Sequence, residues 1–191
     1  GSMAMEKPIR YAEPIAKPVS PTANVSTVYA AITEFGDNHH GGVGVEDHGG
    51  QPGGRDGNNW FFFQTGSGGR EAGIQIDMGQ KLSLADGDSV QVSMLLGAKK
   101  GQTYTAPVVV TLTDGPSGRP LSMASYSPVY ADGKDEVTFV FKEGLRDTKR
   151  SLRVNISFRD ESQEFIQGLA RDIRVVQGMG LKGKVVAVAA V

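Results

Sequence analysis

The sequence predicts an all-β protein built as a two-sheet antiparallel β-sandwich of about nine or ten strands. Apolar and polar residues alternate with a period of two through most of the chain, most clearly in the segment 151–158. Dipeptides typical of turns, such as Asp86-Gly87 and Asp132-Gly133, separate the alternating segments. The 191 residues include 26 glycines and no cysteine, so turns are plentiful and disulfides and thiolate metal sites are excluded.

The N-terminal part of the sequence does not show this alternation. Residues 1–3 are typical of a cloning remnant. Residues 4–25 carry a proline every three to six positions, which predicts a linker or extended arm, with an edge strand as the alternative. The predicted sandwich domain therefore comprises residues 26–191.

The expected elements follow in order along the domain, and their wide spacing favours a sandwich of the jelly-roll type. One helical turn, capped by Asp160, is possible within 159–168. The expected strands lie at 26–33, 59–65, 71–78, 88–97, 106–113, 121–126, 136–142, 151–158 and 169–176, with a last apolar run at 184–191.

The charge balance and the motifs exclude several classes of function. Lys and Arg total 20 against 21 Asp and Glu, and this balance argues against nucleic-acid and anionic-membrane binding. No apolar run approaches the roughly 20 residues of a membrane span. The sequence has no G-x-S-x-G, no P-loop and no recognisable Ser/His/Asp set, so a non-enzyme is predicted.

The segment 36–59 is the most unusual part of the sequence. It contains nine glycines and all three histidines, His39, His40 and His48, together with several Asp, Asn and Glu residues. Three interpretations remain open: a flexible or ligand-rimming loop, a calcium-assisted loop with oxygen ligands, or a histidine-bound metal.

A series of short strand motifs recurs in a recognisable order. The motifs are NWFFF at 59–63, GIQIDMG at 73–79, GDSVQVS at 87–93, VVVTLTD at 108–114, LRVNISF at 152–158 and ARDIRV at 170–175. They resemble the galactose-binding-like β-sandwich of secreted bacterial proteins, many of which are carbohydrate-binding modules. The chain departs from that pattern at Ser89 and at Arg171. The resemblance implies a non-catalytic carbohydrate-binding module of a larger secreted bacterial protein.

The same resemblance implies a structural calcium ion. Family members often hold it between an acidic residue near the first strand and an Asp of the last strand, which here correspond to Glu34, with Asp37 nearby, and Asp172. The alternative for Asp172 is an ion pair with Arg171, Arg174 or Arg153.

Two surfaces are candidates for the sugar site. One is a polar sheet face, expected to carry Gln75, Gln91, Ser93, Thr111, Arg153 and Asn155, whose amide and guanidinium groups suit sugar hydroxyls or uronate carboxylates. The other is a loop edge with aromatic residues for stacking, Trp60, Tyr104, Tyr126 and Tyr130. The alternative for the first surface is a sheet face that only contacts solvent. The alternative for Trp60 is a side chain that packs in the core.

An alternative function is a structural or adhesive sandwich that assembles with protein partners. The uncharged tail 185–191 supports it, because an exposed apolar edge strand invites pairing and self-association. The tail is equally well explained as the final strand of the sandwich.

Overall fold

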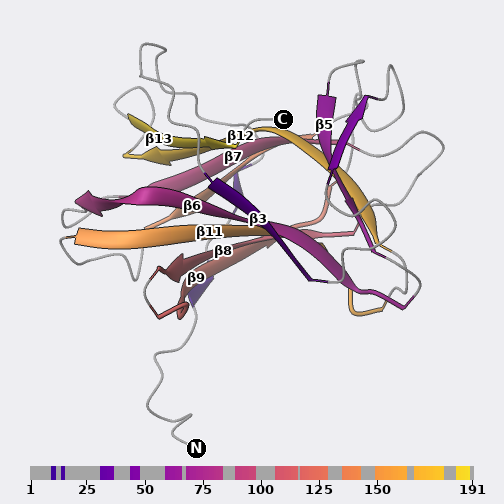
Figure 1. Cartoon of the computed structure of the whole chain (residues 1–191), viewed down its shortest axis with the longest axis horizontal. Coiled ribbons are helices and arrows are strands. Elements are labelled where there is room, and N and C mark those ends of the chain that lie inside the picture. The colour runs from indigo at the N-terminus through magenta and orange to yellow at the C-terminus, as the bar shows by residue number, and fades with distance from the viewer. Residues whose placement is uncertain are drawn as a thin grey trace, which may run out of the picture.

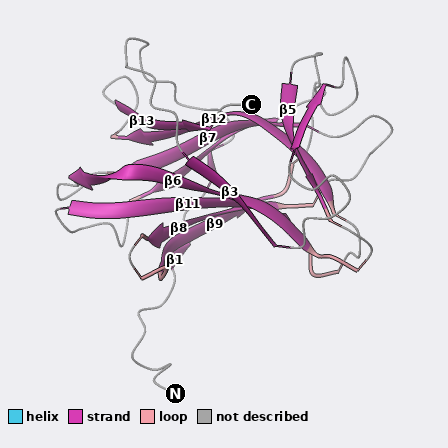
Figure 2. Cartoon of the chain, in the orientation of Figure 1, coloured by secondary structure: helices cyan, strands magenta, loops and turns pink. Residues whose placement is uncertain are grey.

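In the computed structural model the chain forms two packed β-sheets (Figure 1). The described residues are 10–11, 14–15, 31–36, 44–47, 59–65, 68–83, 89–97, 106–115, 117–128, 135–142, 149–162, 166–178 and 184–189. Strands and loops make up this described part, and it contains no helix (Figure 2). It accordingly offers no helix that is long and apolar enough to cross a membrane.

One sheet has six strands in the order β1-β9-β8-β11-β6-β3. All its neighbouring strands are antiparallel except β1 and β9, which are parallel. Its strands are β1 (Arg10–Tyr11), β3 (Ala31–Gly36), β6 (Glu71–Ser83), β8 (Val108–Asp114), β9 (Pro120–Tyr126) and β11 (Lys149–Arg159).

The other sheet has seven strands, six of them in the order β2-β10-β7-β12-β5-β4, while β13 also pairs with β12. The first part of β12 pairs with β5 and its last part pairs with β13, so β12 joins both strands to the sheet. The strands are β2 (Pro14–Ile15), β4 (Gly44–Asp47), β5 (Asn59–Gln64), β7 (Val90–Gly97), β10 (Asp135–Phe141), β12 (Gln167–Gln177) and β13 (Lys184–Ala189).

The predicted fold class is confirmed: the protein is an all-β sandwich of two largely antiparallel sheets. Nine predicted strands lie within a few residues of β5 to β13, and β3 lies later in the chain than the predicted 26–33. Three strands were not predicted, namely β1, β2 and β4, each of four residues or fewer. After β11 the described residues 160–162 form a turn in which Asp160 Oδ1 accepts hydrogen bonds from Ser162, while residues 163–165, where a helical turn could lie, are outside the described residues.

The N-terminal arm pairs with both sheets. Arg10 and Tyr11 lie beside Ser122 and Met123 of β9, whereas Pro14 lies beside Phe139 of β10. A proline is compatible with this position because an edge strand need not donate all its backbone N–H groups. Residues 10–11 and 14–15 thus form short edge strands, and the remainder of 4–25 lies outside the described residues.

The core lies between the sheets and is lined by the inward positions of every long strand. Ile74 and Ile76 of β6 and Val154 and Ile156 of β11 are fully buried. From the opposite sheet, the ring of Phe63 lies against Phe158, with the centroids 5.0 Å apart. Since alternate residues of each strand enter this core, the residues between them must lie on the outer faces.

Gly168 of β12 lies directly beneath the Phe158 ring. A Cβ atom at position 168 would lie only 2.5 Å from Phe158 Cδ1 and Cε1. The sandwich therefore needs glycine here so that the two sheets can approach each other.

We predict that Gly168→Ala lowers the free energy of unfolding by about 1–3 kcal/mol, because the added methyl overpacks the core. Urea unfolding followed by tryptophan fluorescence measures this loss. In a Phe158→Leu background the same substitution should cost clearly less, since the ring is gone. Equal costs in both backgrounds would show that the clash with Phe158 is not the cause.

Candidate functional site

A polar surface covers the outward side of β6, β11 and β8 at the middle of the six-stranded sheet. The registers place Gln75 opposite Asn155, and Asn155 opposite Thr111. Two residues away, Asp77 lies opposite Arg153. We call this surface the polar face. Its residues are Glu71, Gln75, Asp77, Thr111, Arg153 and Asn155, together with Ser157, which is on the same side of β11 but only 3% exposed.

The centre of the polar face is a block of four side chains from β6 and β11. Gln75 Nε2 donates a hydrogen bond of 3.0 Å to Asn155 Oδ1. The neighbouring Arg153 Nε lies 3.5 Å from Asp77 Oδ2, and these side chains are 37% and 42% exposed. Both pairs are thus formed directly across the strands and remain accessible to a ligand.

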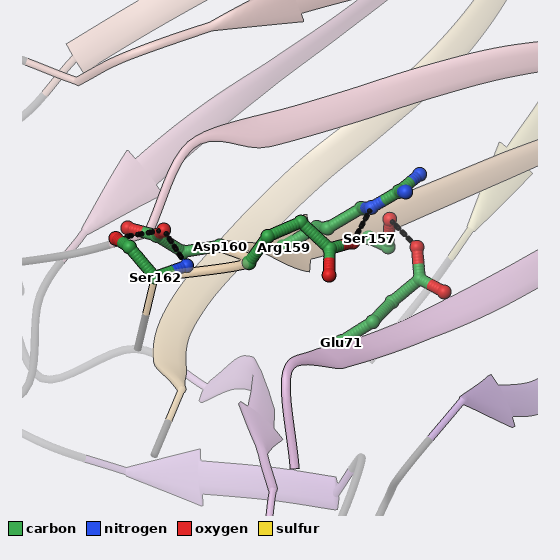
Figure 3. Close-up of polar contacts among 6 residues, drawn as sticks. Glu71, Ser157, Arg159, Asp160 and Ser162 are labelled. Atoms are coloured by element: carbon green, nitrogen blue, oxygen red, sulfur yellow. Dashed lines mark hydrogen bonds and ion pairs between the residues drawn. The ribbon is translucent and has the colours of Figure 1, made fainter. Parts of the chain in front are cut away.

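The polar face continues toward the end of β11 in a second group of polar contacts (Figure 3). Ser157 Oγ donates a hydrogen bond of 2.9 Å to Glu71 Oε2, joining β11 to β6 again. Beyond it, Arg159 Nε pairs with Glu161 Oε1 at 2.9 Å. These acidic side chains already have hydrogen-bond or ion-pair partners within the protein.

The predicted polar face is corrected in one respect. Gln91 and Ser93 belong to β7, in the other sheet, and do not share a surface with Gln75. Gln91 is 1% exposed, and its Nε2 donates to the carbonyl oxygen of Gly178. The period of two shows which residues share one side of a strand, but it does not show which strands share a sheet.

Sequence reasoning missed three members of the polar face, Glu71, Asp77 and Ser157. The signal was present, because each of them alternates with buried residues, as Asp77 does with Ile76 and Met78. Gln75, Thr111, Arg153 and Asn155 do lie together, as the shared sheet of β6, β8 and β11 requires.

The predicted aromatic loop edge is only partly described. Tyr126 ends β9, is half-buried and packs against the hydrophobic core. Trp60 occupies the strand position of β5 that alternates with the buried Phe61 and Phe63. Tyr104 and Tyr130 lie outside the described residues, so this surface remains a prediction.

The predicted metal ligands lie in different sheets. Glu34 is in β3, with its Cα opposite that of Ile74, whereas Asp172 is in β12. The Asp172 side chain is 53% exposed, and its Oδ2 lies 3.3 Å from Arg171 Nε, so the ion-pair alternative with Arg171 is present. Asp37 and the three histidines lie outside the described residues. Within the described ranges, no three His, Cys, Asp or Glu side chains are grouped so that they could hold a metal ion.

Asp172 also has an unusual backbone conformation. Its φ of 52° is in the left-handed region, where residues other than glycine are uncommon. The pairing of β12 with β7 is irregular between Arg171 and Arg174, so Asp172 lies in a β-bulge. This bulge coincides with the point at which β12 changes its other partner from β5 to β13.

The apolar tail is paired within the chain. β13 lies antiparallel to β12, with Val188 opposite Arg174, and Ala187 is fully buried. The described part of the tail thus forms a strand of the sandwich itself, and self-association through 184–191 remains a prediction.

Comparisons with known proteins give the fold but no family. No family model matches the chain, and no curated protein matches it. An arabinose-bound MgGH51 α-L-arabinofuranosidase is similar in structure with a TM-score of 0.57 at 10% identity. The similarity covers 77% of this chain but only 23% of the arabinofuranosidase chain.

A second similar structure is the Stig cyclase Fisc from Fischerella sp. TAU, in complex with an indole compound. Its TM-score is 0.52 at 13% identity, over 87% of this chain and 99% of the cyclase. Both similarities establish a shared β-sandwich fold, and structures with that fold include enzymes.

The amide pair lies on the surface, so we predict that Asn155→Ala lowers the free energy of unfolding by only about 0.2–1 kcal/mol. Truncating its neighbour on the core side, Ile156→Ala, should cost about 2–5 kcal/mol. Urea unfolding of both variants measures the contrast. Similar losses in the two variants would contradict the assignment of position 155 to the outer face.

Proposed function

We propose that the protein binds an oligosaccharide or polysaccharide through the polar face. The observation that carries this proposal is the block of Gln75, Asn155, Asp77 and Arg153, half-buried and held by cross-strand pairing. Sugar hydroxyls are both donors and acceptors, and amide and guanidinium groups fixed on a rigid sheet provide matching partners. The rows of opposing residues run across β6, β11 and β8, which suits a ligand lying across the strands.

The resemblance to galactose-binding-like modules supports the same proposal, and with it a secreted protein of bacterial origin. The structural similarity adds support, because the arabinose-bound arabinofuranosidase contains a sandwich of this fold as part of a longer chain.

We further propose that binding takes place without hydrolysis. Glycoside hydrolysis usually needs two carboxyl groups, one to protonate the leaving group and one to act as nucleophile or base. The described carboxylates of the polar face have other partners, since Asp77 pairs with Arg153 and Glu71 accepts a hydrogen bond from Ser157. These contacts support a binding role for the face.

We predict that Thr111→Trp weakens polysaccharide binding about tenfold or more, since its bulk covers the middle of the polar face; a tenfold loss is about 1.4 kcal/mol. Arg174→Trp is the matched control because Arg174 is exposed on the other sheet. Affinity electrophoresis against arabinan, galactan and xylan measures both variants. Equal binding by Thr111→Trp and the wild type would exclude the polar face as the site.

A structural calcium ion near Glu34 is a further part of the proposal. Position 34 lies in β3, with its Cα opposite that of Ile74. Carboxylate oxygens are among the hard ligands that calcium prefers. Asp37 follows in the sequence and could contribute oxygen ligands. Asp172 fits less well because its carboxylate already pairs with Arg171.

We predict that calcium raises the melting temperature relative to EDTA, since an ion at 100 times its dissociation constant adds about 2.7 kcal/mol to stability. Glu34→Gln should abolish this difference, whereas Asp172→Asn should reduce it less. Differential scanning calorimetry with and without calcium measures all three proteins. Identical melting temperatures of the wild type in calcium and in EDTA would refute the calcium site.

A further inference from the structure

We infer that the Gln75–Asn155 pair binds two neighbouring hydroxyl groups of a neutral sugar, and that the adjacent Asp77–Arg153 pair disfavours uronates. This inference rests on the proposed function and specifies the ligand of the same site. It selects neutral sugar hydroxyls over uronate carboxylates, the two kinds of ligand group that amide and guanidinium side chains can bind.

The amide pair leaves unused hydrogen-bonding capacity on both side chains. One N–H of Gln75 Nε2 is used in the 3.0 Å bond to Asn155 Oδ1. Gln75 then retains a second N–H and its carbonyl oxygen, while Asn155 retains both N–H groups and a lone pair. Because each amide holds the other, the remaining donors and acceptors are oriented before a ligand arrives.

Two hydroxyls on adjacent ring carbons match this arrangement. Each hydroxyl can donate one hydrogen bond and accept others, and the carbon–carbon bond holds the two oxygens close together. One hydroxyl can therefore donate to the Gln75 carbonyl oxygen while its neighbour accepts from Asn155 Nδ2. A sugar with only isolated hydroxyls would satisfy one amide and leave the other paired with water.

The charged pair beside the amides favours a neutral ligand. Arg153 already lies 3.5 Å from the carboxylate of Asp77, its cross-strand neighbour. Gln75 and Asp77 are alternate residues of one strand, and Glu71 lies further along the same side of β6. A uronate bound at the amides would meet like charge and would compete with Asp77 for Arg153, which reduces its affinity.

The test compares four polysaccharides by isothermal titration calorimetry. Linear arabinan carries neighbouring hydroxyls, and periodate oxidation followed by borohydride reduction removes them from the same polymer. A glucan linked through O3 carries no neighbouring free ring hydroxyls in its internal sugars, and polygalacturonate supplies the acidic ligand. We expect binding to arabinan and at least tenfold weaker binding to the other three.

Variants assign these differences to residues. Gln75→Ala and Asn155→Ala should each weaken arabinan binding about two- to tenfold, as expected for the loss of neutral hydrogen bonds. Ser125→Ala is the control, since Ser125 is exposed on β9 of the same sheet. Asp77→Asn should leave Arg153 without its carboxylate partner and increase polygalacturonate binding, with a strong dependence on salt. Urea midpoints measured in parallel show that each variant is folded.

The possible failures are distinguishable. If the wild type binds arabinan and its oxidised, reduced form equally well, or binds polygalacturonate more tightly, the inference is wrong and carbohydrate binding stands. Unchanged arabinan binding by both amide variants would likewise overturn it. If the wild type binds none of the four polymers, nor galactan or xylan, the proposed function itself fails and this inference with it.

Discussion

The register of β11 between β6 and β8 is the constraint on which the rest of the structure depends. Val154 and Ile156 of β11 are fully buried, and they lie opposite Ile76 and Ile74 of β6. A shift of β11 by one residue would move Arg153 and Asn155 into the core and expose Val154 and Ile156. Burying an unpaired arginine costs far more free energy than a polar contact contributes to stability. Core packing therefore determines which polar residues face outward and which of them pair across the strands.

The sequence allowed the strands to be predicted because their inward residues recur every second position over long segments. The alternation does not assign strands to sheets, so it predicts one surface for Gln91 and Gln75 although β7 and β6 belong to different sheets. The short strands β1, β2 and β4 carry too few residues to show any period. The bulge at Asp172 was equally invisible, because a single residue in the left-handed region leaves no pattern in the sequence.

Three of the four residues of the central block could be predicted from the sequence. Gln75, Arg153 and Asn155 were recognised as outward polar residues, but their partners depend on register, which only the structure provides. Asp77 is an example. The sequence shows only an acidic residue in a strand, whereas the register makes Asp77 the cross-strand neighbour and ion-pair partner of Arg153. The fold itself does not decide function, since it occurs both in an arabinofuranosidase and in a cyclase. The function must therefore be argued from these side chains.

We propose above all that the outer face of β6, β11 and β8 binds the sugar. The most direct measurement is a backbone NMR titration with arabinan oligosaccharides. We expect the largest amide shift changes in 73–77, 109–113 and 153–157. Changes concentrated instead around Trp60 and the segment 36–59 would contradict it and place the ligand at the loop edge.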